Sequence, residues 1–225
     1  MRHDFSVIVP CYNEEGNIQE CIDRILGLGR GYEIVVVDDG SADRTSEKAR
    51  GIKSKRIRVV GYRKNRGKGY AVREGIRNAS GSVVAIQDAD MATLPEELPD
   101  ILKPIKEGRA DFVNGSRFIY SMERGAMKGI HVFGNKIFAI LVSILIRKRI
   151  TDSLCGLKAF RKDMLAGKLK EDSWPDFELL VQAKRNGLRI AEVPVHYGAR
   201  RAGKSKMKTF RHGWKLLRML VKQMV

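Results

Sequence analysis

Short apolar runs alternate with segments of helical periodicity over the first half of the chain. Each run is continuous in aliphatic residues and bounded by polar or turn residues, which is typical of buried strands. The predicted strands cover 5–9, 34–37, 57–60, 83–86 and 112–113. The segments between them predict helices over 13–25, through Arg50 and over 71–78, the second with a cap at Ser41 and Asp43.

This alternation of strand and helix predicts an α/β fold with a mainly parallel sheet, because helical crossovers are the usual connection between parallel strands. In such sheets ligands bind outside the carboxyl ends of the strands. Polar clusters lie at that edge of the predicted sheet: 12–14, 38–39, 66–68 and 88–90. We therefore expect the functional site there.

Two amphipathic segments in the second half, 126–150 and 205–225, mix basic residues with apolar helix formers. This pattern favours helices that lie in a membrane interface, although contact with the core or with a partner produces it too. We predict one domain over 1–204, which includes the first segment, followed by a membrane-surface helix over 205–225. The longest uncharged apolar stretch, Ile137–Ile146, is shorter than the roughly 20 residues that cross a bilayer. We therefore expect any membrane contact to be peripheral.

The net charge indicates which kinds of binding partner to expect. Lys and Arg number 43 against 26 Asp and Glu, a formal charge of +17. Such a surplus favours nucleic acid, phosphorylated small molecules or an acidic membrane face. The sequence has no zinc finger, RNP-like motif or clear helix-turn-helix, which argues against nucleic acid. Three widely spaced cysteines and the lack of a signal peptide predict a cytoplasmic protein.

Asp88 and Asp90, separated by Ala89, follow the strand over 83–86. Residues i and i+2 of an extended segment point the same way, so both carboxylates can reach one cation or one cation-bound diphosphate. Hard divalent cations such as Mg²⁺ and Mn²⁺ prefer carboxylate oxygens and keep positions for phosphate oxygens. The pattern indicates a metal site, with a solvated turn as the alternative.

Three other clusters are candidates for binding a nucleoside or an anion. Asp38 and Asp39 are placed to accept hydrogen bonds from a base or a ribose, or to cap a helix. Lys68 lies in a glycine-punctuated loop without P-loop spacing, which excludes a P-loop NTPase. Arg117 ends the fifth strand. The basic residues around Gly203 form either a loop that closes over phosphate or a solvated charge run.

Seven motifs occur together and in a fixed order: SVIVPCYNEEGNI, EIVVVDDGSADRT, NRGKGYAVREGI, DAD, NGSRF, DSLCGLKAFRKD and DFELLVQAKRNGLRIAEVPVHYGARRAGKSKM. With them the chain resembles the family 2 inverting glycosyltransferases, and among these the dolichyl-phosphate mannose synthases and glucosyltransferases. The resemblance implies a GT-A-type nucleotide-sugar-binding fold, a mainly parallel mixed sheet flanked by helices, with C-terminal amphipathic helices. It also implies inverting transfer of mannose or glucose from GDP-mannose or UDP-glucose to a polyprenyl (dolichyl) phosphate.

The resemblance also implies roles for individual residues. Asp88 and Asp90 would bind Mg²⁺ or Mn²⁺ with the diphosphate. Arg117 would meet the lipid phosphate or the donor diphosphate, and Lys128 lies where mannose synthases have an acceptor-phosphate arginine. Further positions would contact the donor: Pro10, Tyr12, Glu14, Val37, Asp39, Ala89, Arg200 and Lys206. We add Lys68 to the donor-binding residues because of its loop.

Two features set the chain apart from the mannose synthases. The mannose synthases carry a glutamine two residues after the second aspartate, as a further metal ligand. This chain has Ala92 at that position. Another group must then complete the metal shell. The DSLCGLKAF motif is closer to the glucosyltransferase version, so the sugar and the base stay open.

The expected chemistry needs no general base, because a polyprenyl phosphate is already an anion. The cation would act as a Lewis acid for the leaving group. Basic side chains would offset the anionic crowding: Arg117, Lys128, Arg200 and Lys206. The expected location is the cytoplasmic face of an anionic membrane, with a small membrane protein as a further candidate anchor. A family 2 transferase with a soluble or glycan acceptor is the alternative.

Overall fold

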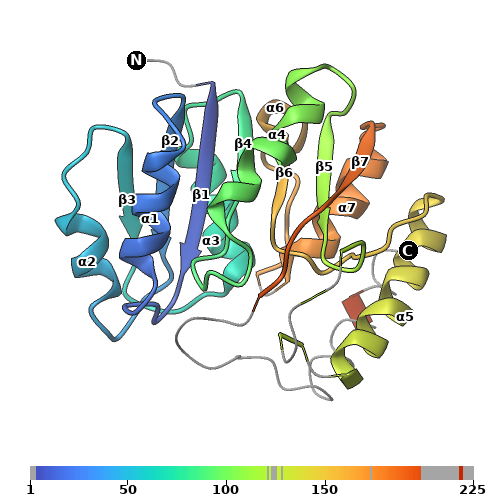
Figure 1. Ribbon diagram of the computed structural model, residues 1–225, viewed down its shortest axis with the longest axis horizontal. Coiled ribbons are helices and arrows are strands. Elements are labelled where there is room, and N and C mark those ends of the chain that lie inside the picture. The colour runs from blue at the N-terminus through green and yellow to red at the C-terminus, as the bar shows by residue number, and fades with distance from the viewer. Residues whose placement is uncertain are drawn as a thin grey trace.

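The computed structural model describes residues 4–120, 122, 126–127, 129–172, 174–198 and 218–219. Within them, seven strands form one sheet in the order β3-β2-β1-β4-β6-β5-β7 (Figure 1). The strands are β1 (Phe5–Cys11), β2 (Tyr32–Asp38), β3 (Ile57–Gly61), β4 (Val83–Ile86), β5 (Phe112–Ser116), β6 (Lys158–Arg161) and β7 (Ile190–Pro194). Only β6 is antiparallel to its neighbours among these pairs. The predicted mainly parallel mixed sheet is confirmed.

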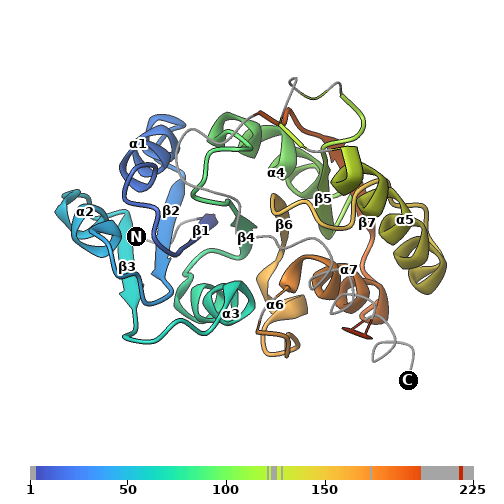
Figure 2. The ribbon, with the colours of Figure 1, turned by 90° about the horizontal axis from the view of Figure 1, so that it is seen from below.

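Helices cover both faces and both ends of the sheet. They are α1 (Ile18–Gly27), α2 (Thr45–Gly51), α3 (Lys68–Asn78), α4 (Leu98–Lys106), α5 (Gly129–Ile146), α6 (Lys162–Leu165) and α7 (Pro175–Arg185), with a 3-10 turn η1 (Pro95–Glu97). One face carries α1 and α4, and the other carries α3, α6 and α7 (Figure 2). The two remaining helices lie at opposite ends of the sheet, α2 beside β3 and α5 beyond β7.

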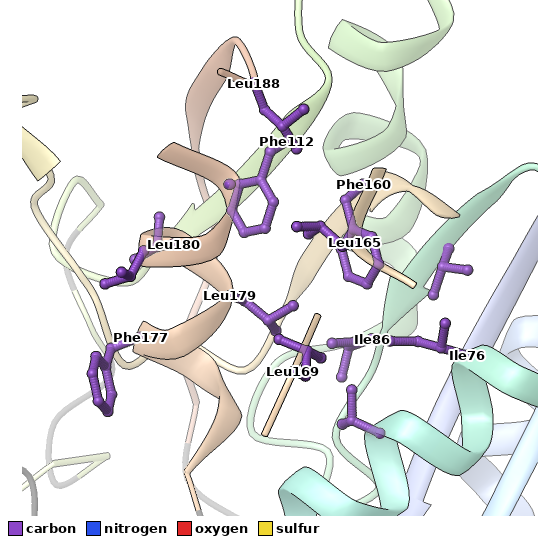
Figure 3. Close-up of a cluster of buried hydrophobic side chains, with 14 of the residues drawn as sticks. Ile76, Ile86, Phe112, Phe160, Leu165, Leu169, Phe177, Leu179, Leu180 and Leu188 are labelled. Atoms are coloured by element: carbon purple, nitrogen blue, oxygen red, sulfur yellow. The ribbon is translucent and has the colours of Figure 1, made fainter. Parts of the chain in front are cut away.

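The alternation of side chains along the strands divides the core into two layers. In β1, Val7 and Val9 pack with α1 and α4, whereas Ile8 packs with α3 and α7. Figure 3 shows the second layer, where Phe112 and Phe160 stack with ring centroids 6.0 Å apart beneath α7. Burial of such a continuous apolar surface is the main driving force for this fold.

Several elements of the second half were not predicted. The β6 strand has only four residues, of which Lys158 and Arg161 are charged, so the sequence shows no apolar run there. The β7 strand is a half-buried edge strand with Glu192 in its middle. The α2 cap also differs from the prediction. Asp43 accepts a hydrogen bond from the Thr45 amide, but the Ser41 hydroxyl accepts one from the Asn13 amide instead.

The α5 helix is longer than the uncharged stretch identified in the sequence. It extends back from Ile137 to Gly129 and includes Lys136 as its single lysine, arginine or acidic residue. By length and composition alone it is the one helix among the described residues that qualifies as a membrane span, with a mean hydropathy of 1.9 and 28% of its residues buried. Ile137–Ile146 is the uncharged part of this helix, so its length alone does not exclude a membrane span. Core helices of soluble proteins also meet this criterion.

The second predicted amphipathic segment, 205–225, lies almost entirely outside the described residues. Only Arg218 and Met219 are described. Met219 is buried in the core layer that also contains Phe138 of α5 and Phe177 of α7. At this point the segment contacts the domain, which was the alternative to a membrane contact.

The order of the strands places a topological switch point at one edge of the sheet. The chain passes from β1 to β2 and β3 on one side, and β4 then pairs with the other side of β1. After β1 the chain therefore turns toward β2, and after β4 it turns toward β6 and β5, with α1 and α4 on the same face of the sheet. Such switch points are where open α/β sheets bind their ligands.

Candidate functional site

The polar clusters predicted from the sequence do lie along one edge of the sheet. They follow β1, β2 and β4, and Arg117 follows β5. The ends of β1 and β4 are adjacent, since the Gln87 amide donates to the Ile8 carbonyl over 2.9 Å. Because β6 is antiparallel, the loop before it, including Gly156, reaches the same edge. Figure 2 looks onto this edge.

Asp88 meets a lysine and a second aspartate at this edge. Lys68 Nζ lies 2.8 Å from Asp88 Oδ1 and 3.2 Å from Asp176 Oδ1. Lys68 begins α3 and Asp176 lies in the first turn of α7, so the three charges join both helices to the end of β4. Burial disfavours charge on Lys68, but Asp176 and Asp88 outweigh it and raise its pKa. Burial also raises the pKa of Asp176, and Lys68 acts against that shift.

Hydrogen bonds inside the turn and from the Gln87 side chain hold the turn that carries Asp88 and Asp90. Asp90 Oδ1 accepts from the Ala92 amide over 3.1 Å. The Gln87 side-chain amide donates to the carbonyls of Asp88 and Thr93 over 3.1 and 2.8 Å. Gln87 is fully buried, so replacing its amide would leave both carbonyls without this partner. Its role was missed. The available signal was a polar amide directly after an apolar strand.

Gly156 leaves the space that the Asp88 carboxylate occupies. A Cβ at this position would lie 2.0 Å from Asp88 Oδ2 and 2.9 Å from Lys68 Nζ. Neither distance is possible without movement. The glycine of the loop before β6 is therefore a steric requirement for the position of Asp88.

The substitution Gly156→Ala is expected to displace Asp88 and to weaken Mn²⁺ binding at least about tenfold, at a stability cost of about 1–3 kcal/mol from overpacking. Calorimetric titration with Mn²⁺ and urea unfolding measure the two effects. Gly51→Ala is a matched control, because a Cβ there has no neighbour within 4 Å. Unchanged Mn²⁺ affinity in Gly156→Ala would contradict the steric argument.

The residues at this turn fit a hard divalent cation. Asp88 and Asp90 offer carboxylate oxygens, the donors that Mg²⁺ and Mn²⁺ prefer. Across the described part of the chain, no three His, Cys, Asp or Glu residues gather as a metal site. Among the described residues, Asp88 and Asp90 would thus be the protein ligands, with phosphate oxygens or water beside them. Mg²⁺ sites with one or two carboxylates and substrate phosphates have this composition.

Asp38 and Asp39 are bound to neighbouring loops. Asp38 Oδ1 accepts from the Ser41 amide over 3.0 Å. Asp39 accepts from the Asn65 side chain and from the Arg66 and Gly67 amides over 2.8–2.9 Å. Neither carboxylate accepts a hydrogen bond from the first amide of α2. The structure therefore does not show Asp38 or Asp39 as the cap of that helix. The carboxylate of Asp39 ties the end of β2 to the loop before Lys68, and its contact with a nucleoside stays a prediction.

Arg117 forms a buried ion pair that the sequence did not reveal. Its Nε and Nη2 donate to the two carboxylate oxygens of Asp152 over 2.6 and 2.9 Å. Burial disfavours the charged form of Asp152, but Arg117 lowers its pKa below the usual value. Burial likewise opposes the charge of Arg117, and Asp152 raises its pKa. Asp152 thus orients the guanidinium, and a phosphate contact of Arg117 stays a prediction.

A buried lysine lies near this pair. Lys158 is fully buried, and its ammonium donates to Asn114 Oδ1. Burial lowers the pKa of Lys158. The Asn114 amide donates to the Asp152 carbonyl and to Glu192 Oε1 over 2.7 and 2.9 Å, which links β5, β7 and the 151–157 loop. These polar contacts hold together the strand and the loop that carry Arg117 and Asp152.

The other predicted donor-binding positions are distributed as follows. Pro10 and Val37 are register partners in β1 and β2, and Ala89 is buried in the aspartate turn. Tyr12 and Glu14 lie in the turn after β1, where Glu14 Oε2 accepts from the Asn17 side chain over 2.8 Å. Three predicted positions lie outside the described residues: Lys128, Arg200 and Lys206.

Similarity to known proteins agrees with this geometry. The model of the family described as Glycosyl transferase family 2 matches residues 6–167. A dolichol-phosphate mannosyltransferase of Pyrococcus furiosus is 36% identical over 90% of this chain, which spans 59% of that protein's length. A dolichyl-phosphate hexose transferase of Haloferax volcanii is 34% identical over 97% of this chain and 93% of its own.

The fold has solved relatives at lower identity. Glucosyl-3-phosphoglycerate synthase of Mycobacterium tuberculosis, in complex with Mn²⁺, UDP and glucosyl-3-phosphoglycerate, superposes with a TM-score of 0.74 at 24% identity. The superposition covers 98% of this chain and 78% of the synthase. It shows the GT-A-type fold that the sequence resemblance implied. Together with the match to the family model, it leads to one assignment: the chain belongs to glycosyl transferase family 2.

Proposed function

We propose that the protein transfers a hexose, with inversion, from a nucleotide sugar to a polyprenyl phosphate at the cytoplasmic face of a membrane, with Mg²⁺ or Mn²⁺ as cofactor. The observation that carries the proposal is the position of Asp88 and Asp90 at the switch point between β1 and β4, beside Lys68. Relatives that cover nearly the whole chain are named for transfer to dolichyl phosphate, which supports the acceptor.

The donor would lie across the carboxyl ends of β1, β2 and β4. Asp88 and Asp90 would hold the cation, which supplies Lewis-acid stabilisation of the leaving diphosphate. Lys68, which lies next to Asp88, would contact a diphosphate oxygen. Arg117, whose guanidinium is bound by Asp152, would contact the acceptor phosphate with the small exposed part of its side chain. The acceptor oxygen is already anionic and attacks the anomeric carbon without a general base.

An exposed apolar surface on α5 supports a membrane-bound acceptor. We call this surface the α5 stripe; it consists of Ile130, Phe133, Ile137, Ile140 and Ile144, which are 44–68% exposed. Directly after the helix come three exposed basic residues, Arg147, Lys148 and Arg149. An apolar face bordered by cations suits the boundary between acyl chains and anionic headgroups. The opposite side of α5 packs on the core, which favours a helix lying on the membrane over one crossing it.

A transfer assay tests the acceptor and the donor together. The protein is incubated with UDP-glucose or GDP-mannose, Mn²⁺, and liposomes that contain polyprenyl phosphate, and labelled sugar in the lipid fraction is measured. We expect transfer from one of the two donors and its loss in excess EDTA. Transfer to a soluble phosphorylated or glycan acceptor, with none to the lipid, would favour the alternative function.

The double substitution Phe133→Asp with Ile140→Asp is expected to reduce binding to anionic liposomes at least about tenfold, because it removes apolar burial and adds negative charge to the α5 stripe. Flotation measures the bound fraction. The control is a pair of exposed residues on α4 and before it, Asp100→Asn with Glu96→Gln, which changes charge without touching the stripe. Equal flotation of the stripe variant and the wild type would contradict this role of α5.

A further inference from the structure

Lys68 forms an ion pair with Asp88, the carboxylate that would also bind the proposed metal. Its ammonium lies within 2.8 Å of Asp88 Oδ1 and 3.1 Å of Oδ2, so it contacts both oxygens. Asp176, at 3.2 Å, is the second anionic partner of the ammonium. One lysine therefore bridges the end of β4 and the start of α7.

The backbone around Lys68 is fixed, so the ammonium is directed to this position. Before it, the Arg66 and Gly67 amides donate to Asp39 over 2.8 Å. After it, the Gly69 amide donates to the Asp172 carbonyl over 2.7 Å. Asp88 lies close to Gly156 as well, since a Cβ added there would lie 2.0 Å from Asp88 Oδ2. The ion pair is built into the start of α3.

Two cations next to one carboxylate repel each other, and this repulsion is strong where water is partly excluded. A divalent ion that takes Asp88 as a ligand must therefore displace the ammonium from it. Lys68 then keeps Asp176 as a partner, and a bound diphosphate offers new anionic oxygens to replace Asp88. Metal without diphosphate lacks this compensation.

We propose that Lys68 is an internal counter-ion for Asp88, which the metal displaces only when it arrives together with the diphosphate of the donor. This inference rests on the proposed metal site. It makes the binding of metal and of nucleotide cooperative, and by thermodynamic linkage each tightens the other by the same factor. The consequence is that the site takes up metal as a complex with the donor and holds free metal weakly.

The test is a titration of the whole protein with Mn²⁺, read by the electron paramagnetic resonance signal of free Mn²⁺, with and without UDP or GDP. Lys68→Met removes the charge at similar side-chain length. We expect Mn²⁺ alone to bind about tenfold more tightly to Lys68→Met than to the wild type, and the tightening caused by nucleotide to shrink correspondingly. Lys64→Met is the matched control, because it removes one charge from an exposed position of the same loop.

A second variant controls for a change in Mn²⁺ binding that is caused by misfolding of Lys68→Met. Lys68→Met combined with Asp176→Asn removes both members of one partly buried pair and leaves the summed charge of the cluster unchanged. It should show the same tighter binding of Mn²⁺ alone. Unchanged or weaker Mn²⁺ binding in both folded variants would overturn the counter-ion role. Because no sugar transfer is measured, that result would leave the proposed transferase activity standing.

Discussion

The substitution Asp90→Ala is expected to lower the rate of sugar transfer about a thousandfold while leaving the fold intact. The reason is that the variant loses one of two carboxylates for the cation that stabilises the leaving diphosphate, a loss of about 4 kcal/mol in transition-state stabilisation. Within the turn, Asp90→Ala also loses the hydrogen bond that Asp90 Oδ1 accepts from the Ala92 amide. Initial rates with saturating Mn²⁺ and the preferred donor measure the effect.

The control for this variant is Asp100→Ala, which removes an exposed carboxylate from α4. It should retain the wild-type rate. Thermal unfolding of both variants separates a chemical loss from a structural one. Wild-type rates in Asp90→Ala would exclude this carboxylate from the metal site.

The second large effect is expected on stability, from the buried pair of Arg117 and Asp152. Asp152→Ala should lower the free energy of unfolding by about 3–5 kcal/mol, because it leaves a guanidinium buried without its carboxylate. Urea unfolding measures the change. Glu47→Ala, which breaks an exposed pair with Arg44, should change stability little.

A double substitution tests whether the unpaired charge is the cause. Arg117→Met with Asp152→Leu removes both charges and keeps apolar volume, so it should be less destabilising than Asp152→Ala alone. If the double variant is the less stable one, the unpaired buried guanidinium is not the main cause of the loss in Asp152→Ala.

The first half of the fold could be predicted because its signals are local. The strands β1 to β4 are short apolar runs separated by turn residues, and each was placed within a few residues of its bounds. The second half lacks that signal. β6 includes the buried Lys158, whose polar partner Asn114 lies on another strand, so its burial depends on a distant contact. No periodicity within four residues reveals such a strand.

The same distinction applies to the site. Asp88, Asp90 and Lys68 were identified because each lies in a recognisable motif near the end of a predicted strand. Asp152 and Asp176 were missed as site residues because their partners are far away in the sequence: Asp152 binds Arg117, and Asp176 binds Lys68. Side-chain pairing across the sheet edge is a property of the assembled fold.

The structure adds a role that the sequence did not show. Asp39 was expected to bind a nucleoside, which stays a prediction, and its carboxylate also accepts hydrogen bonds from Asn65, Arg66 and Gly67. A motif identifies the residue types that gather at a site. It does not say which of them contact the ligand and which hold the loops that do.

The most direct test of the central claim is calorimetric titration of UDP and GDP into the protein, in Mn²⁺ and in EDTA, for the wild type and for Asp90→Ala. If Asp88 and Asp90 hold the cation that binds the diphosphate, one nucleotide should bind the wild type at least about a hundredfold more tightly in Mn²⁺, and Asp90→Ala should lose most of that difference. Equal affinities in Mn²⁺ and in EDTA, or an unchanged metal effect in Asp90→Ala, would contradict the account.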